Sequence, residues 1–319
     1  MLVRFWGTRG SLPAPMTARA ATDKIRGALR KSAGHDLSSD EKVEAFIDSE
    51  LEFAESGTYG GNTSCVEIDG GADEYVVCDL GSGSRDFGNA IMSKFTPGKS
   101  TVVNVFQSHP HWDHICGFPF FVPAYIPGNK IRIHGCHDTL EEAYRIQNSA
   151  PGFPVDFDML ASDIEFVKLE TETEYEIAGI KVTAMKQHHS GDSYGYRFEK
   201  DGKSVVYSTD SEHKFESIDE SYGFVEFFRN ADLLIFDAMY SLADAISLKE
   251  DWGHSSNIIG VELAHRAHVK QLALYHHDPN SDDATISRIL AETIRFEELS
   301  EEGDSLNVCA AFDGQEIRL

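Results

Sequence analysis

The sequence predicts a mixed α/β fold in which stacked β-sheets are covered by helices. Short segments rich in β-branched residues, such as TVVNVFQ at Thr101–Gln107, recur along the chain. Segments with helical periodicity lie between them, and turns rich in glycine and aspartate separate several of the strands. Of the 319 residues, 41% are hydrophobic and 25% are charged, which is close to the globular average. Since neither an internal repeat nor a domain linker is visible, we expect one domain over residues 1–319.

The N-terminal part is expected to hold one strand and a helical insertion. Leu2–Trp6 has the composition of a strand, and a glycine-rich loop follows it at Gly7–Pro15. Residues from about 17 to 57 carry many charges and helix formers. Ser39 is a candidate N-cap. It precedes apolar residues at helical spacing, namely Val43, Phe46, Ile47 and Leu51. We therefore expect two helices, inserted between strands.

The rest of the chain is expected to alternate strands and helices. Ser64–Ile68 and Glu74–Asp79 predict a hairpin, because Asp69-Gly70-Gly71 between them is a turn sequence. A helix near Ser84–Phe95 leads into the strand at Thr101–Gln107. Further strands are expected near residues 131–135, 181–186, 194–199, 204–209, 232–236 and 271–275, and helices near 214–229, 255–268 and 283–299. The chain ends in two strand-like segments, SLNVCAAF and EIRL.

Charge and cysteine content limit the classes of partner. The chain has 53 acidic and 28 basic residues, a net charge of −25, which argues against an extended nucleic-acid surface. No apolar run approaches the ~18 residues of a membrane helix, and the N-terminus does not resemble a signal peptide. The five cysteines are odd in number and irregularly spaced, unlike a disulfide framework. We therefore expect a cytoplasmic protein with reduced thiols and no membrane partner.

A histidine-rich segment carries the strongest chemical signal. Four candidate metal ligands, His109, His111, Asp113 and His114, lie within six residues directly after the strand at Thr101–Gln107. Alternate residues of such a loop can converge on one cation, while the next pair faces a second cation. Imidazole and carboxylate groups suit Zn²⁺, Mn²⁺ or Fe²⁺.

This HxHxDH segment resembles the signature of the metallo-β-lactamase superfamily. The resemblance implies a four-layer αβ/βα sandwich, here with the helical insertion near the N-terminus. It also implies two divalent metal ions, with zinc preferred and manganese or iron as alternatives. The first ion would be bound by His109, His111, His189 and Asp210, and the second by Asp113, His114, Asp210 and His276. Asp79, at the end of the strand EYVVCD, would orient the ligands from behind.

Two of these assignments choose between neighbouring histidines. His189 is preferred over His188 because a small residue and glycine follow it, as in the superfamily pattern. His276 is preferred over His277 because His-x-x-Pro resembles the last motif of ribonuclease Z. The other histidine of each pair could support a ligand, face the substrate or lie neutral in the core.

Further segments resemble the branch that contains ribonuclease Z and phosphoribosyl cyclic phosphodiesterases. The bridging position is Asp210, and lactam-cleaving zinc enzymes have cysteine there. LLIFDAM resembles the HEAT-type motif of ribonuclease Z, with Asp237 in place of its glutamate, and GHSS resembles its His-Ser-Thr motif. The resemblance implies that Asp237 orients His254, and that His254 faces the scissile phosphate.

The function implied by the resemblance is metal-dependent hydrolysis of a small phosphodiester or a cyclic nucleotide-like substrate. Asp113, His254 and Asp237 would be the catalytic residues. Weaker candidates for substrate contacts are Ser190, Arg197 and His277, and Arg197 could equally form a structural ion pair. The alternatives are a lactone or thioester hydrolase with the same two-metal site and a nuclease that processes tRNA 3′ ends. Superfamily relatives are often dimers, so a homodimer stays open.

Overall fold

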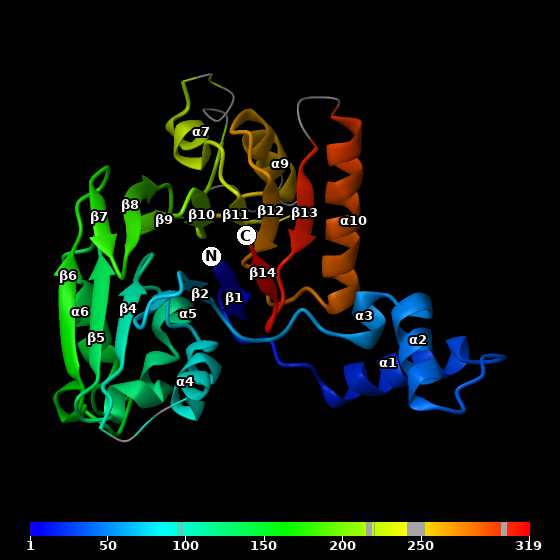
Figure 1. Ribbon diagram of the computed structural model, residues 1–319, viewed down its shortest axis with the longest axis horizontal. Coiled ribbons are helices and arrows are strands. Elements are labelled where there is room, and N and C mark those ends of the chain that lie inside the picture. Colours follow the sequence, from blue (N-terminus) through cyan, green and yellow to red (C-terminus); the bar gives the residue numbers. More distant parts are fainter. Residues whose placement is uncertain (95, 97, 215–218, 220, 241–252, 301–304) are drawn as a thin grey trace.

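Two mixed β-sheets form the centre of the structure, a computed structural model that describes residues 1–94, 96, 98–214, 219, 221–240, 253–300 and 305–319 (Figure 1). In the first sheet the strand order is β14-β1-β2-β3-β4-β5-β6. Its strands are β1 (Leu2–Gly7), β2 (Cys65–Asp69), β3 (Tyr75–Cys78), β4 (Val102–Phe106), β5 (Lys130–Gly135), β6 (Asp163–Lys168) and β14 (Glu316–Arg318). Pairing is antiparallel from β14 to β3 and parallel from β3 to β6.

The second sheet has a similar division. Its order is β13-β12-β11-β10-β9-β8-β7, antiparallel from β7 to β10 and parallel from β10 to β13. Its strands are β7 (Glu174–Ile177), β8 (Ile180–Gln187), β9 (Ser193–Lys200), β10 (Lys203–Ser208), β11 (Leu233–Asp237), β12 (Gln271–Tyr275) and β13 (Asn307–Ala310). Parallel strands end at the same edge, so the loops after β10, β11 and β12 lie close together.

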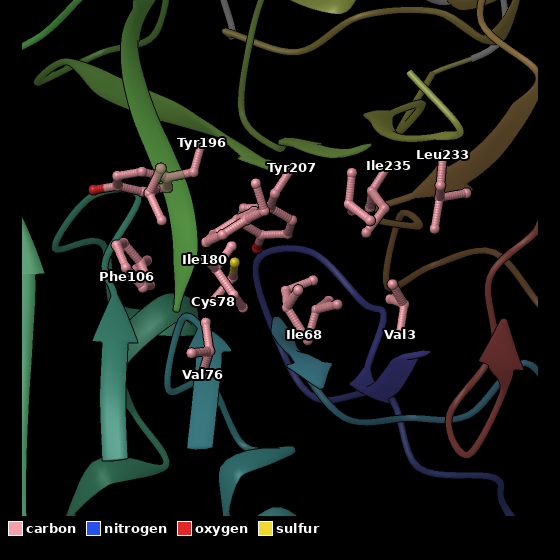
Figure 2. Packing of buried hydrophobic residues seen from close by; sticks show 14 of the residues in the cluster. Val3, Ile68, Val76, Cys78, Phe106, Ile180, Tyr196, Tyr207, Leu233 and Ile235 are labelled. Atoms are coloured by element: carbon pink, nitrogen blue, oxygen red, sulfur yellow. The ribbon is translucent and has the colours of Figure 1, made fainter. Parts of the chain in front are cut away.

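The core between the two sheets follows from the alternation of side chains along the strands. In β10, Val205 and Tyr207 pack into the inter-sheet core, while Val206 packs among the helices on the other face. In β4, Phe106 points inward and Val105 outward. A strand with apolar residues on both faces can be buried on both, and this explains continuous apolar runs such as LLIF. Figure 2 shows the inter-sheet core, which extends from Phe106 and Tyr196 at the left of the view to Val3 and Leu233 at the right.

Helices cover the outer face of each sheet and complete four layers. On the first sheet they are α4 (Ser84–Ser93), α5 (Trp112–Ile115) and α6 (Leu140–Gln147). On the second sheet they are α7 (Gly223–Phe228), α9 (Asn257–Arg266) and α10 (Asp283–Leu299). The predicted αβ/βα sandwich is therefore confirmed. No described helix is long and apolar enough to cross a membrane.

The predicted helical insertion is present and lies at one side of the molecule. It consists of α1 (Ala18–Lys31), α2 (Asp40–Glu50) and the short α3 (Phe53–Ser56). The sequence predicts two helices there. The third, α3, forms because Glu52 and Glu55 make a reciprocal capping box. α3 packs against both α1 and α10. Figure 1 shows α1 and α2 beyond the lower end of α10, on the far side from the first sheet.

Some predicted elements differ from the structure. Of the helix expected near 214–229, the structure shows α7 (Gly223–Phe228). Residues 215–218 and 220 of that range lie outside the described residues. The helix expected from 255 begins at Asn257, because the Ser256 side chain caps it. The strands β6 and β7 are missing from the prediction, because their exposed faces give them weak apolar patterns. The helix α6 is also missing, although Leu140 and Tyr144 are buried at helical spacing, because it is only eight residues long.

Candidate metal centre

The histidine-rich segment lies at the carboxyl end of β4, a strand in the parallel half of the first sheet. Its last residues form α5 instead of the predicted open loop. This single turn places Asp113 and His114 on the buried side of the segment, while Trp112 between the ligands is 55% exposed. The turn therefore separates the segment into two pairs of candidate ligands, His109 with His111 and Asp113 with His114.

The first group of candidate ligands lies around one oxygen of Asp210. Oδ2 of Asp210 is 3.7 Å from His109 Nε2 and 3.6 Å from His189 Nε2. His189 Nε2 is also 3.1 Å from His111 Nδ1. These are the four residues predicted for the first ion, and they come from the segment after β4 and the loops after β8 and β10.

The second group lies around the other oxygen of Asp210. Oδ1 of Asp210 is 3.2 Å from His114 Nε2 and 3.2 Å from His276 Nε2. Asp113 Oδ2 is 3.2 Å from His114 Nε2 and 3.3 Å from His276 Nε2. Asp210 thus turns one carboxylate oxygen to each group, the arrangement expected of a bridging ligand.

The donor atoms of both groups fit divalent cations. Nε2 of His109 and Nε2 of His114 are buried and have no hydrogen-bond partner among the described residues, although both face Asp210. Burial alone would lower the pKa of His114, yet the carboxylates of Asp113, Asp210 and Asp79 hold it well above its usual value. The site therefore has a strongly negative potential and unpaired imidazole nitrogens, which a bound cation would satisfy.

Asp79 lies behind the histidines of the cluster. Its carboxylate is completely buried and lies 2.7 Å from His114 Nδ1, so Nε2 of that ring faces the cluster. Ser108 Oγ and Tyr207 Oη also donate to it, each at 2.7 Å. Ser108 Oγ lies 3.0 Å from His109 Nδ1 and so orients a second ligand. The sequence gives no signal for Tyr207, because its hydroxyl reaches Asp79 only across the packed sheets.

The glycine-rich loop after β1 also lies against this centre, a position that its own sequence does not indicate. The amide of Ser11 donates to Asp113 Oδ2 at 2.7 Å. Gly10 packs so closely on His276 that a Cβ atom would lie 2.5 Å from its ring. The buried guanidinium of Arg9 fixes the loop through the carbonyls of Gly60, Asp278 and Ser281. The available signal is the glycine-rich composition of Gly7–Pro15, which by itself predicts only a loop.

Asp237 and His254 form a pair beside the second group. Asp237 Oδ2 lies 2.8 Å from His254 Nδ1, and amides of Ser211 and Met239 also donate to this carboxylate. The His254 ring stacks on that of His276 with 5.1 Å between centroids. Burial lowers the pKa of His254, but Asp237 outweighs it and raises the pKa to about 9. A protonated imidazole beside the cluster is suited to donate a proton.

The structure separates the neighbouring histidines and the weaker candidates. His189 lies in the first group, whereas His188 is exposed beside Phe224. His277 is buried with Nε2 2.8 Å from the carbonyl of Ala311, and burial lowers its pKa to about 4. His277 is thus the neutral core residue that the sequence left open.

The three residues predicted as weaker candidates for substrate contacts, Ser190, Arg197 and His277, lie in different surroundings. The Arg197 guanidinium forms an ion pair with Glu199 at 2.7 Å and donates to the carbonyl of Phe227. Of its two expected roles, the structure therefore favours the structural ion pair over a substrate contact. Ser190 lines a pocket of about 640 Å³ beside His189, together with Lys186 and Gly253. Of Ser190, Arg197 and His277, Ser190 is the one that lines this pocket.

Comparison with known proteins decides the family. A family described as "Beta-lactamase superfamily domain" matches residues 77–277, which include all seven candidate ligands. The chain belongs to the metallo-β-lactamase superfamily. Ribonuclease Z of Picrophilus torridus is 24% identical over 58% of this chain and 72% of that protein.

Solved structures share the fold of this superfamily member. The metallo-β-lactamase fold protein YhfI from Bacillus subtilis has a TM-score of 0.64 at 18% identity, over 99% of this chain and 98% of YhfI. A diphosphatase from the PhnP family has a TM-score of 0.58 at 18% identity, over 100% of this chain and 97% of the diphosphatase. As a member of the metallo-β-lactamase superfamily, the protein is a metal-dependent hydrolase. Its described residues include His/Asp clusters that could hold divalent ions.

Proposed function

We propose that this protein is a phosphodiesterase that acts on a small phosphodiester or a cyclic nucleotide-like substrate. The pair of Asp237 and His254 carries the proposal. His254 Nδ1 lies 4.0 Å from Asp210, so the ring borders the candidate metal centre. Alkoxide leaving groups of phosphodiesters need a proton, and an imidazolium held by a buried carboxylate can supply it.

We infer that two ions occupy the centre, with zinc preferred over manganese and iron. His109, His111, His189 and Asp210 would bind one ion, and Asp113, His114, His276 and Asp210 the other. Five imidazoles and two carboxylates match the ligand types that zinc favours. Counting metal per chain in purified protein by mass spectrometry tests the number and the identity together.

In this mechanism the protein positions the ions, the substrate and one proton. When bound, the ions supply Lewis acidity that ionises water near neutral pH and positive charge for the phosphate oxygens. Asp237 accepts from His254 Nδ1, so Nε2 of that ring holds the proton that the leaving oxygen receives. Asp113, a ligand beside His114 and His276, is our proposed acceptor of the proton from the attacking water. Ser190 contributes a hydroxyl to the adjacent pocket.

Processing of tRNA 3′ ends is a second candidate. It is favoured by the curated relative named ribonuclease Z. The net charge of −25 opposes it, because a tRNA must lie along a protein surface at several phosphates. A small substrate reaches the centre without that contact.

A substrate panel distinguishes these functions. We would compare bis-p-nitrophenyl phosphate, a cyclic nucleotide, a precursor tRNA and a lactone, each with Zn²⁺, Mn²⁺ or Fe²⁺. We expect kcat/KM to be highest for one of the two small phosphodiesters. Preferred cleavage of precursor tRNA would establish the second candidate, and preferred lactone opening would refute both.

The acid role of His254 has its own test, because it depends on the leaving group. For a cyclic nucleotide, whose leaving oxygen is an alkoxide, His254→Ala should lower kcat by about 10²-fold or more. For bis-p-nitrophenyl phosphate the loss should be much smaller, since nitrophenolate leaves without a proton. Equal losses for both substrates at unchanged metal content would contradict the acid role.

We also propose that the protein works in the reducing cytoplasm. All five cysteines are free. Burial raises the pKa of Cys65 and Cys78 well above the usual value for a thiol, so both stay protonated and unreactive. Free thiols that persist in protein purified without reductant, counted with a thiol reagent after unfolding, would support this, and a disulfide would oppose it.

A further inference from the structure

We propose that α1 and α2 form a dimer interface whose partner is a second copy of this chain. The two helices project from the edge of the molecule, away from the first sheet (Figure 1). They also carry apolar side chains that no described part of the chain covers. The candidate metal centre is built without them, so the proposal does not depend on the proposed function.

The exposed apolar surface is continuous. α1 has no buried residue, and Ile25 and Leu29, one turn apart, are 61% and 66% exposed. Between α1 and α2 lies an open groove of about 540 Å³. Its apolar lining residues include Ile25, Leu29, Leu37, Val43, Ile47 and Leu51. Exposed apolar surfaces of this kind mark interaction sites.

The groove is held in place by the rest of the protein. Lys24 of α1 forms an ion pair with Asp283 at the start of α10, at 2.6 Å, and also donates to the carbonyl of Gly57. Lys31, at the other end of α1, pairs with Glu55 of α3 at 2.6 Å. α1 is therefore fixed at both ends, and its ridge of Ile25 and Leu29 is presented as a preformed surface.

The charges of the two helices indicate the partner. α1 has five basic residues and one acidic residue, a net charge of +4, with Arg19, Lys24, Arg26, Arg30 and Lys31 against Asp23. α2 has five acidic residues and one basic residue, a net charge of −4, with Asp40, Glu41, Glu44, Asp48 and Glu50 against Lys42. Lys24 and Lys31 are already paired with Asp283 and Glu55, so α1 offers a partner a net charge of +2 through Arg19, Arg26 and Arg30 against Asp23. The segment thus presents two helices of opposite charge.

Such a surface is complementary to itself under a two-fold rotation. In a two-fold dimer, residue i of one copy meets residue j of the other, and the reverse contact repeats it. The basic α1 of each copy can then lie beside the acidic α2 of the other. The two apolar ridges meet at the centre, and four helices form a bundle that buries what the two-helix hairpin leaves exposed.

A membrane surface fits this segment less well. The basic, amphipathic α1 alone would suit anionic lipid. However, α2 lies across the groove with a net charge of −4, and the whole chain carries −25, so an anionic surface would be repelled. A second copy of the chain satisfies both helices.

The first experiment removes the apolar ridge. We expect the full-length protein to sediment as a dimer, and the variant Ile25→Asp with Leu29→Asp to sediment as a monomer. Its dimer dissociation constant should rise by at least ~10-fold. The matched control is Ile146→Asp on α6, an equally exposed apolar residue at 66%, which should leave the dimer intact. Circular dichroism checks that both variants are folded.

The second experiment exchanges charges, and it does not depend on the apolar changes being tolerated. One variant changes α1 with Arg26→Glu and Arg30→Glu, and the other changes α2 with Glu44→Lys and Asp48→Lys, and each pair of changes takes the net charge of its helix to 0. Each variant alone should be monomeric, because the attraction between α1 and the partner's α2 is lost at both contacts. Mixed together, they should form a heterodimer, in which one contact joins unchanged helices and the other joins the new glutamates of α1 to the new lysines of α2.

Three results would overturn the proposal. They are a monomeric parent protein, a dimer that survives both the ridge and the charge variants, and charge-reversed variants that fail to associate on mixing. Parent protein that stays monomeric and sediments with phosphatidylserine vesicles would identify the surface as a lipid-binding one instead.

Discussion

At the scale of single residues, hydrogen bonds to one ring nitrogen of a histidine decide which nitrogen faces the candidate metal centre. His114 and His189 each use Nδ1 for a hydrogen bond, to Asp79 and to the carbonyl of Gly253, so that Nε2 faces the cluster. His254 has the same arrangement with Asp237, and in the proposed function its ring holds a proton. Hydrogen bonds behind the rings therefore orient the candidate ligands and the proposed acid alike.

The pH dependence of catalysis should report the pair of Asp237 and His254. The protonated form of His254 is the active one, and Asp237 raises its pKa to about 9 despite burial. Activity should therefore fall as the pH rises through the pKa of His254. In Asp237→Asn the stabilising charge is gone, so the pKa falls and the alkaline limb of kcat should move to lower pH. An unshifted limb in this variant would assign it to another group.

Gly253 should be needed for the first ion. A Cβ atom there would lie 2.3 Å from His189 Nδ1. Gly253→Ala should displace His189 and lower the metal content by about one ion per chain and kcat by about 10²-fold. Gly202→Ala is the matched control, since both glycines have a positive φ, +81° and +72°, but a Cβ at Gly202 meets no atom. Equal metal loss in both variants would mean that backbone strain, not the contact, is responsible.

At the scale of elements, strands that are buried on both faces were predictable, whereas the exposed edge strands β6 and β7 were not. β4 and β11 are apolar on both faces, and their segments stand out as continuous β-branched or aliphatic runs. β6 and β7 at the sheet edges are mostly exposed and lack that pattern. The burial of an edge strand depends on its neighbours, which its own sequence does not record.

A buried histidine in β5 should make the fold sensitive to acid. His134 stacks on Phe106, and burial lowers its pKa to about 4. Between pH 6.5 and 4 the unfolded chain binds a proton that the folded chain does not, so stability falls as the pH falls. The titration of this one histidine should lower the free energy of unfolding by about 2 kcal/mol between pH 7 and pH 5. The difference in unfolding free energy between pH 7 and pH 5 should shrink by that amount in His134→Leu.

An exposed histidine provides the control for this measurement. Urea denaturation of His268→Asn should give the same pH difference as the parent, because His268 is exposed. Asparagine also tolerates the positive φ of 53° at this position. A pH difference unchanged in His134→Leu would show that another group causes the acid sensitivity.

At the scale of the whole molecule, the candidate ions join the two halves of the sandwich. The four candidate ligands before residue 120 follow β4 of the first sheet. The other three, His189, Asp210 and His276, follow strands of the second sheet. Without cations, acidic and unpaired basic atoms face one another across this junction. Metal binding should therefore stabilise the packing of the sheets as well as the chemistry.

Metal removal should consequently lower the thermal stability of the entire fold. At a free metal concentration of about 100 times Kd, binding adds roughly 2.7 kcal/mol to the free energy of unfolding. Dialysis against a chelator should lower Tm by several degrees, and added Zn²⁺ should restore it. Asp210→Ala should have a low Tm that zinc no longer raises. Parent protein with the same Tm before and after verified metal loss would contradict this role.

The sequence by itself determined the chemistry of the centre, and the tertiary structure decided its geometry. The spacing of His109, His111, Asp113 and His114 is local, so their convergence after one strand could be inferred from the chain alone. The preference for His189 and His276 also came from local sequence patterns, whereas the positions of Ser11 and Tyr207 depend on contacts between segments far apart in the sequence. Such contacts arise only when the two sheets pack, because that packing fixes which loop ends face each other.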